Sequence, residues 1–146
     1  MSINNYRSET FLTNDGSILS TSGSFSFQID HIAIRKEESK LKGMTPVSAW
    51  LNSLSACHLL VMKLLSNDQK INLKNAKIII EASTEDKEDN DYHGITEMTI
   101  HYYIQAENTV EEISQFIKYT QKNCTIHSTI EQLKKTKLNY VIHVVK

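Results

Sequence analysis

The chain has 146 residues, of which 23% are charged and 40% hydrophobic, and its formal net charge is -1. This composition indicates one globular domain over residues 1–146 with a buried core, and excludes a disordered chain. A net charge so close to zero gives no sign of a nucleic-acid-binding surface. We find no secretory signal at the N-terminus and no membrane-spanning stretch, so we expect a cytoplasmic protein whose cysteines are not locked in a permanent disulfide.

The first third of the chain is predicted to form strands. The sequence NDGS at residues 14–17 is a strong turn signal between two β-like runs and predicts a hairpin. The run SFSFQI at residues 24–29 alternates apolar with polar side chains, as a half-buried strand does. The alternation changes phase at residues 30–31 and resumes over residues 32–37.

A long helix is predicted next, from Thr45 to Leu65. Thr45 is a suitable N-cap, and Pro46 fits the first helical turn. Apolar residues then occur on nearly every side, which predicts a helix buried all round. Cys57 lies in its middle, followed by His58.

The second half of the chain alternates strand and helix signals. Strands are expected at residues 76–83 and 98–105, joined by a charged, turn-rich loop. Thr109 and Glu112 form a capping box that opens a helix ending near residues 122–123. A second helical segment is expected from Cys124, and residues 138–145 form a strong last strand pattern. The apolar positions expected to face inward are Met98, Ile100, Tyr102 and Ile104 on the strand, then Ile113, Phe116, Ile117 and Thr120 on the first helix.

Strands clustered in hairpins with segregated helices predict an α+β fold with antiparallel sheets around a long central helix. We find no repeat, linker or domain boundary in the sequence.

The chain has two cysteines, Cys57 and Cys124. Taken alone, a cysteine within an apolar helix is usually an inert packing residue. With Asn123 as N-cap, Cys124 would lie in the first turn of the next helix, where free N–H groups lower a thiol pKa. Together the two resemble a nucleophile and its resolving partner, which could reduce a peroxide through a sulfenic acid and a disulfide.

A metal site is the competing chemistry for the same residues. Cys57 and His58 are adjacent on a helix and point about 100° apart, and no CxxC or HExxH spacing is present. We therefore predict no metal and no cofactor. His58 is expected at a helix edge and His127 on the surface.

The stretch TPVSAWLNSLSACHLL, residues 45–60, resembles the OsmC/Ohr family of osmotically induced and organic-hydroperoxide-resistance proteins. In that family the central helix opens with a proline and reaches a cysteine eleven residues later, as Pro46 and Cys57 do. CTIHSTI, from Cys124, loosely matches the second cysteine motif, and SILSTSGSFSF at residues 17–27 resembles the second strand.

The resemblance implies an intertwined homodimer with its sites at the subunit interface. It implies that Cys57 is the peroxidatic cysteine and Cys124 the resolving one. The expected substrates are organic hydroperoxides, including those of fatty acids, and a dithiol reductant restores the thiols.

The sequence departs from the family at the residues that activate the thiol. Family members use a glutamate just after the helix-opening proline, where this chain has Val47 and Ser48. They also use an arginine on the N-terminal hairpin, at a position that aligns near Asn14; Arg7 and Arg35 are the only arginines here. The alternative function is therefore a non-catalytic protein that binds a small apolar ligand at the dimer interface.

Overall fold

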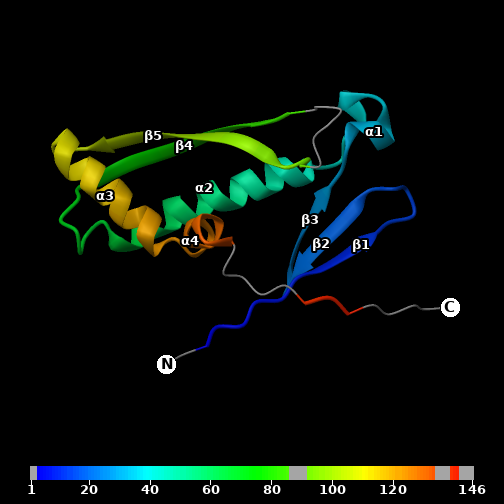
Figure 1. The fold of residues 1–146 in the computed structure, drawn as a ribbon, viewed down its shortest axis with the longest axis horizontal. Coiled ribbons are helices and arrows are strands. Elements are labelled where there is room, and N and C mark those ends of the chain that lie inside the picture. The colour runs from blue at the N-terminus through cyan, green and yellow to red at the C-terminus, as the bar shows by residue number, and fades with distance from the viewer. Residues whose placement is uncertain (1–2, 86–91, 134–138, 142–146) are drawn as a thin grey trace. The chain divides into compact units, whose positions relative to one another are not determined.

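The structure is a computed structural model and describes residues 3–85, 92–133 and 139–141. The chain divides into two compact units, residues 1–52 and 53–146. The boundary falls within the long helix α2, Pro46–Leu65 (Figure 1). Each unit is described in turn.

The first unit contains a three-stranded antiparallel sheet in the order β1 (Glu9–Leu12), β2 (Ile18–Ser22), β3 (Phe25–Ile29). The predicted turn joins β1 to β2, with the Thr13 amide donating to the Ser17 carbonyl at 2.9 Å. Gly16 has a φ of 83°, in the left-handed region that glycine adopts without strain. The predicted hairpin is confirmed.

Residues 32–37 do not continue the strand pattern. They form the single helical turn α1 (Ile32–Arg35), followed by a short 3-10 helix at Glu38–Lys40. His31 caps α1, because its Nδ1 accepts from the Ala33 amide at 3.1 Å. The His31 side chain gives the Ala33 amide a hydrogen-bond partner outside the sheet, which favours a helical turn over a longer strand.

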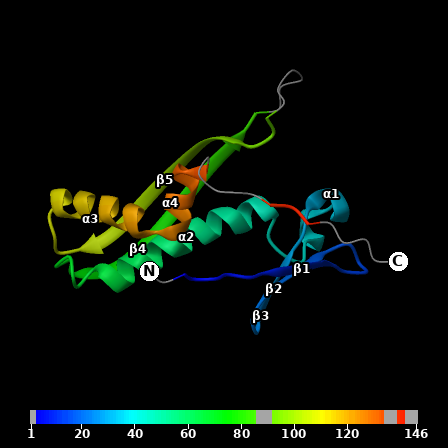
Figure 2. The same cartoon turned by 60° about the horizontal axis from the view of Figure 1, so that its bottom comes forward.

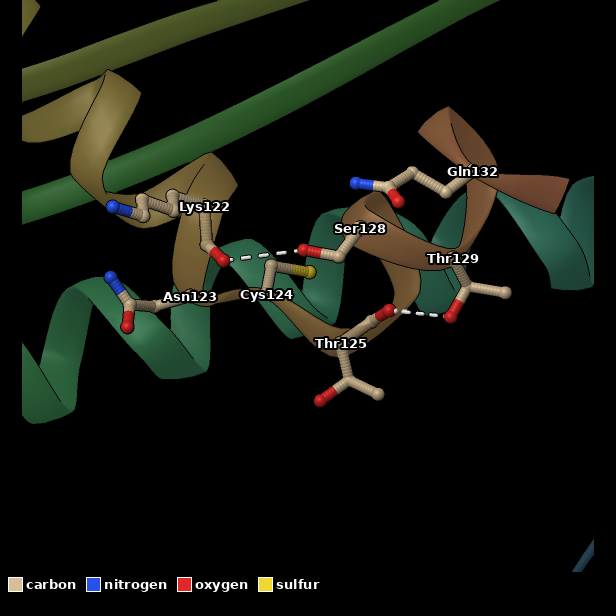
Figure 3. A pocket seen from close by; sticks show the side chains of 7 residues that line it. All are labelled: Lys122, Asn123, Cys124, Thr125, Ser128, Thr129 and Gln132. Carbon is tan, nitrogen blue, oxygen red and sulfur yellow. Dashed lines mark hydrogen bonds between the residues drawn. The ribbon is translucent and has the colours of Figure 1, made fainter. Parts of the chain in front are cut away.

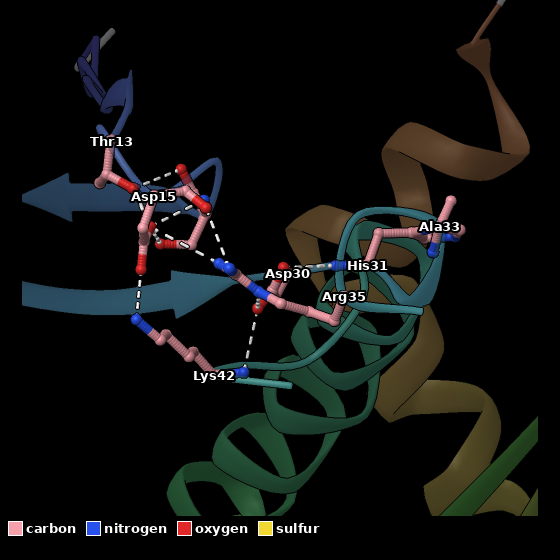
Figure 4. Close-up of polar contacts among 8 residues, drawn as sticks. Thr13, Asp15, Asp30, His31, Ala33, Arg35 and Lys42 are labelled. Carbon is pink, nitrogen blue, oxygen red and sulfur yellow. Dashed lines mark hydrogen bonds and ion pairs between the residues drawn. The ribbon is translucent and has the colours of Figure 1, made fainter. Parts of the chain in front are cut away.

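Asp30 fixes the segment that follows the sheet. Its carboxylate is fully buried and accepts from Arg35 Nε at 2.6 Å and from the Lys42 amide at 3.0 Å (Figure 4). The carboxylate of Asp15, at the hairpin tip, accepts from Thr13 and pairs with Lys42. These bonds favour the ionised carboxylates, so the pKa values of both aspartates lie below their usual range.

The prediction of a half-buried strand at residues 24–29 is only partly correct. β3 forms, but Phe25 is 80% exposed and Phe27 50% exposed. Among the described residues of this unit, the buried ones are the polar Ser17 and Asp30, so the unit itself does not place these aromatic rings in an apolar core.

Helix α2 begins as predicted. Thr45 Oγ1 accepts from the Ser48 amide at 3.2 Å, and Pro46 is the first helical residue. The prediction that the helix is buried all round is wrong for the single chain. Its buried residues, Leu54, His58 and Met62, follow one another at four-residue spacing on one side. Elsewhere on the helix, Leu60 and Leu64 are 63% and 74% exposed.

The second unit contains a two-stranded antiparallel hairpin, β4 (Leu73–Thr84) and β5 (Ile95–Ala106). Both predicted strands are confirmed and are longer than expected. Ile78 pairs with Tyr102 across the hairpin. The inward face of β5 is the predicted one, since Tyr103 is exposed and its neighbours Tyr102 and Ile104 are partly buried. Of the predicted connecting loop, residues 86–91 lie outside the described part of the chain.

Helix α3 (Val110–Asn123) starts at the predicted capping box, with Thr109 and Glu112 bonded reciprocally. Phe116 and Thr120 on its predicted stripe are buried. In Figures 1 and 2 the ribbons of α2 and α3 run beside the β4–β5 hairpin. The core between them is centred on Met62, Ile71 and Phe116.

A second helix, α4 (Thr125–Glu131), follows α3 directly, as predicted. The predicted strand over residues 138–145 lies mainly outside the described residues; Asn139–Val141 within it have no regular secondary structure. Within the described ranges, no helix has the length and apolar character needed to cross a bilayer.

Candidate active site

The second unit brings the two cysteines together, although 67 positions separate them in the sequence (124 − 57). Cys57 projects from the middle of α2, and Cys124 lies at the junction of α3 and α4. Both are free thiols, and Cys57 lies close enough to Cys124 to raise the pKa of the Cys124 thiol. Cys57 is partly exposed, whereas Cys124 is 0% exposed. The more accessible thiol therefore sits against a fully buried one.

Cys124 is itself the N-cap of α4, one residue later than the predicted cap Asn123. Its Sγ accepts from the His127 amide at 3.4 Å. Asn123 is instead the last residue of α3, and its side-chain amide donates to the Tyr119 carbonyl at 2.8 Å. Cys124 is the residue with extended backbone between the two helices, at φ −86° and ψ 116°, so its side chain caps α4.

The prediction that the pKa of the Cys124 thiol is lowered is wrong, because the pKa is raised. Burial and, next in size, the neighbouring Cys57 side chain together raise the pKa of the Cys124 thiol to about 11. The His127 amide acts in the opposite direction but does not offset the desolvation. At neutral pH Cys124 is therefore a protonated thiol, and an attack by its sulfur requires removal of the proton.

A shallow hollow of about 580 Å³ opens over the α3–α4 junction. It is lined by Lys122, Asn123, Cys124, Thr125, Ser128, Thr129 and Gln132 (Figure 3). Ser128 Oγ donates to the Lys122 carbonyl at 3.2 Å and so ties α4 to the end of α3. The lining exposes polar and apolar surface in nearly equal amounts, so it does not by itself favour a polar molecule over an alkyl chain.

The structure contradicts the predicted positions of both histidines. His58 is 0% exposed, and His127 is partly buried rather than on the surface. His58 Nε2 lies 3.1 Å from His127 Nδ1, and His58 Nδ1 lies 3.0 Å from the Tyr102 hydroxyl. Burial, and then the neighbouring His127, lower the pKa of His58 to about 4. His58 is therefore neutral at physiological pH.

Tyr102 and Gln121 are site residues that the sequence reasoning missed. Gln121 Nε2 donates to the Tyr102 hydroxyl at 3.1 Å, and the rings of Tyr102 and His58 are stacked with centroids 5.8 Å apart. Tyr102 was predicted to face inward, and His58 to lie on an apolar helix. Since buried polar side chains need partners, these two predictions together could have indicated the pair.

Neither Val47 nor Ser48 supplies the carboxylate that the family resemblance led us to expect after Pro46. Val47 is 50% exposed and cannot ionise, and Ser48 is used in the capping turn with Thr45. Within the first unit, Arg35 is bound to Asp30 and Arg7 to Glu9. Both arginines thus already have carboxylate partners of their own. In the described part of the chain, no three acidic, His or Cys side chains are placed to hold a metal ion.

The fold and the two neighbouring thiols are features of a known class of protein, which comparisons with other proteins identify. The family model for OsmC-like protein matches residues 36–139, so the chain belongs to the OsmC-like family. A hydroperoxide reductase from Mycoplasma genitalium is 31% identical over 134 residues, or 92% of each chain. A hydroperoxide reductase from Mycoplasma pneumoniae is 26% identical over the same share of both chains.

Solved structures show the same fold. The OsmC-like protein of Mycoplasma pneumoniae superposes with a TM-score of 0.81 at 25% identity, over 98% of this chain and 99% of that one. An organic hydroperoxide resistance protein from Bacillus subtilis superposes with a TM-score of 0.60 at 14% identity, over 90% and 93%. The α+β architecture with antiparallel sheets is thus that of the family, as the sequence resemblance indicated.

Proposed function

We propose that the chain is a thiol-dependent peroxidase that reduces organic hydroperoxides, with Cys57 as the attacking thiol and Cys124 as the resolving one. The observation that carries the proposal is the proximity of Cys57 and Cys124 in the second unit, where Cys57 raises the pKa of the Cys124 thiol. The relatives named hydroperoxide reductase support it.

The chemistry balances without a cofactor. The Cys57 thiolate attacks the terminal oxygen of the hydroperoxide and breaks the O–O bond, so Cys57 becomes a sulfenic acid. The other oxygen leaves with the organic group as an alkoxide, which gains a proton to give an alcohol. Cys124 then attacks the Cys57 sulfur, forming a disulfide as the hydroxyl leaves as water. A dithiol reductant exchanges with this disulfide and restores both thiols.

The exposure of the two thiols supports this division of roles. Cys57 is partly exposed and can meet a substrate, whereas the side chain of Cys124 is fully buried in the single chain. The high pKa of Cys124 also makes it the poorer first nucleophile. Because both thiols belong to the same unit of one chain, the disulfide step is intramolecular, which favours it over further oxidation of Cys57.

The exposed apolar residues support an intertwined homodimer. Leu60 and Leu64 on α2, and Phe25 and Phe27 on β3, are all at least half exposed in the single chain. Apolar surface of this kind on a sheet and a long helix is usually covered by a partner. A second copy covering it would also form the apolar surroundings suited to an alkyl or fatty-acyl hydroperoxide. The family match spans residues 36–139 and includes parts of both compact units, which supports a single OsmC-like domain over residues 1–146; the cytoplasm is the compartment that we propose for it.

A second function is favoured by a specific observation. Val47 and Ser48 replace the family's acid, and Arg7 and Arg35 are both paired with carboxylates. A site without that activating ion pair suits a non-catalytic protein that binds a small apolar ligand at the dimer interface.

The two functions are separated by following a hydroperoxide directly. Wild type and Cys57→Ser are incubated with cumene hydroperoxide and dithiothreitol, and peroxide consumption is measured. The peroxidase proposal expects consumption by wild type and none above background by Cys57→Ser. Equal rates in the two proteins would refute it. Intact mass after peroxide alone gives a second readout: loss of two hydrogens supports the disulfide, and unchanged thiols support the ligand-binding function.

A further inference from the structure

A hydrogen bond between two histidines joins the helices that carry the cysteines. His58 follows Cys57 directly on α2, and His127 lies three residues after Cys124, in the first turn of α4. The His58 Nε2 and His127 Nδ1 atoms are 3.1 Å apart, which is hydrogen-bond distance. The bond therefore links α2 to α4 at positions next to both thiols in the sequence.

His127 also holds the Cys124 sulfur through its backbone. The amide of His127 donates to Cys124 Sγ at 3.4 Å, while the side chain of the same residue bonds His58. The Cys124 carbonyl accepts from the Ser128 amide at 2.9 Å, so the sulfur and the carbonyl of Cys124 are both bonded to the first turn of α4. A movement of His127 would therefore move the amide that holds the sulfur.

His58 is a fixed point of attachment for this bond. Its side chain is 0% exposed, and its ring is stacked on that of Tyr102 with centroids 5.8 Å apart. The Tyr102 hydroxyl lies 3.0 Å from His58 Nδ1 and accepts from Gln121 Nε2 at 3.1 Å. A buried polar network whose members are all bonded is rigid, so His58 offers His127 a partner with one orientation.

The other side-chain nitrogen of His127 determines which atom donates in this bond. His127 Nε2 lies 3.2 Å from Glu131 Oε1, and because an ionised carboxylate only accepts, Nε2 donates there. The Nδ1 atom of such a neutral imidazole is an acceptor, so it accepts from His58 Nε2. Toward α2, the His127 side chain therefore acts as a hydrogen-bond acceptor at the Nδ1 position.

Helix α4 depends on such bonds for its position. It has seven residues, none of them buried, and a helix of that length is not stable alone. Ser128 Oγ donates to the Lys122 carbonyl at 3.2 Å and joins α4 to the end of α3 (Figure 3). The bond between His127 and His58 joins α4 to α2 instead. It is thus the bond that places α4 against the helix that carries Cys57.

We propose that His127 is a positioning residue for the disulfide step. Its bond to His58 holds the Cys124 sulfur where it can reach the sulfenic acid of Cys57. The role in the reaction rests on the proposed peroxidase function, but the placement of the two thiols can be measured without a peroxide. The attack of Cys57 on the hydroperoxide comes first and does not use Cys124, so the bond acts on the second step alone.

Two reactions form the same disulfide and both depend on the placement of the thiols. In the peroxidase, a sulfenic acid and a thiol give a disulfide and water as the S–S bond forms and the S–O bond breaks. With oxidised dithiothreitol, the protein dithiol gives up two electrons and two protons, and the reagent becomes the dithiol. Well-placed groups have a high effective concentration, so the equilibrium constant of the exchange reports how the thiols are placed.

The variant His127→Ala tests the proposal, because it removes the side-chain bond to α2 and keeps the backbone amide that donates to Cys124. His127→Asn is the conservative variant, since its side-chain oxygen restores an acceptor near the place of Nδ1. His101→Ala is the matched control: His101 lies on β5 and bonds Glu81 of β4, outside this network.

The reduction potential of the disulfide is the first readout. Each protein is equilibrated with dithiothreitol at a series of reduced-to-oxidised ratios, quenched with acid and alkylated, and intact mass gives the fraction of disulfide. The loss of one hydrogen bond changes an equilibrium by up to about tenfold. We therefore expect the His127→Ala disulfide to be about tenfold less stable, which is a potential about 30 mV less negative. His127→Asn should stay within about threefold of wild type, and His101→Ala should equal it.

The rates of the two peroxidase steps are the second readout. Each protein is mixed with cumene hydroperoxide and quenched at successive times; dimedone traps the sulfenic acid, and intact mass gives the disulfide. We expect His127→Ala to form the sulfenic acid within about twofold of the wild-type rate, and the disulfide about tenfold more slowly. A purely structural role of His127 would slow both steps and would not be rescued by His127→Asn.

The other end of the bond gives a second test in case His127→Ala does not fold. His58→Leu removes the donor at a similar side-chain volume, whereas His58→Gln keeps a donor near the place of Nε2. We expect a disulfide about tenfold less stable in His58→Leu than in His58→Gln. Equal potentials in these two variants would contradict the proposal.

The outcomes separate the positioning role from the peroxidase function. A wild-type potential and disulfide rate in His127→Ala would overturn the positioning role, as would equal impairment of His127→Asn or equal slowing of both steps. If wild type consumes no hydroperoxide, the peroxidase function fails, and the potentials still decide whether His127 places the thiols. A wild-type protein that forms no disulfide with oxidised dithiothreitol would refute the placement itself.

Discussion

Acidification should destabilise the protein through His58. The pKa of this side chain is lowered from 6.5 to about 4, mainly because it is buried. Between these two pH values the unfolded chain binds a proton that the folded chain does not, so stability falls as the pH falls through this window. Below about pH 4 both states are protonated and the loss is complete.

The size of the effect follows from the two pKa values. The full difference corresponds to roughly 3 kcal/mol, of which about 2 kcal/mol is lost between neutral pH and about pH 5. This is a large part of the stability of a typical domain, about 5–15 kcal/mol. The paired carboxylates Asp15 and Asp30, whose pKa values are also low, add losses only at still lower pH.

Urea unfolding at about pH 7 and about pH 5, at one fixed protein concentration, measures the loss. The variant His58→Gln removes the titrating group, and we expect it to lose about 2 kcal/mol less than wild type over this interval. His101→Gln, which changes an exposed histidine paired with Glu81, should behave as wild type. Equal losses in wild type and His58→Gln would show that His58 is not the group responsible.

Three further results are expected. Phe116→Ala should lower the free energy of unfolding by about 3–5 kcal/mol, because Phe116 is 2% exposed in the core. Val110→Ala, at an 80% exposed site, should change it by less than about 0.5 kcal/mol. If urea unfolding gave similar values for the two variants, the packing described would be contradicted. Thr109→Ala removes the capping box of α3 and should cost about 1 kcal/mol, and an unchanged unfolding midpoint would mean that the cap contributes nothing. In the native protein, iodoacetamide near neutral pH should alkylate Cys57 well before Cys124, which is buried and has a pKa of about 11; peptide mass spectrometry would contradict this if Cys124 reacted first.

Local signals in the sequence predicted most of the elements correctly. The NDGS turn, the Thr45 cap before Pro46, and the capping box of Thr109 and Glu112 all lie where the structure has them. Each depends on bonds between residues at most four positions apart, so its information is contained in a short stretch of sequence. The predicted segment at residues 32–37 was wrong because the side chains of Asp30 and His31 compete for the backbone after β3.

Burial was predicted less well than secondary structure. Helix α2 was expected to be buried all round, and β3 half buried, yet Leu60, Leu64 and Phe25 are exposed in the single chain. A hydrophobic side chain is expected to be buried, but the residue type does not show whether its own chain or another chain buries it. The sequence therefore could not distinguish a core face from an interface.

The sequence by itself determined the helix that carries Cys57, the cap region that carries Cys124, and the family to which both motifs belong. Only the tertiary structure decided the chemistry around them. It placed Cys124 in a fully buried position with a raised pKa, where the helix-start signal alone had predicted a lowered one. It also joined His58, Tyr102 and His127, which lie far apart in the sequence, into one hydrogen-bonded chain. Desolvation and long-range hydrogen bonds depend on which elements pack together, and no local pattern of residues encodes that.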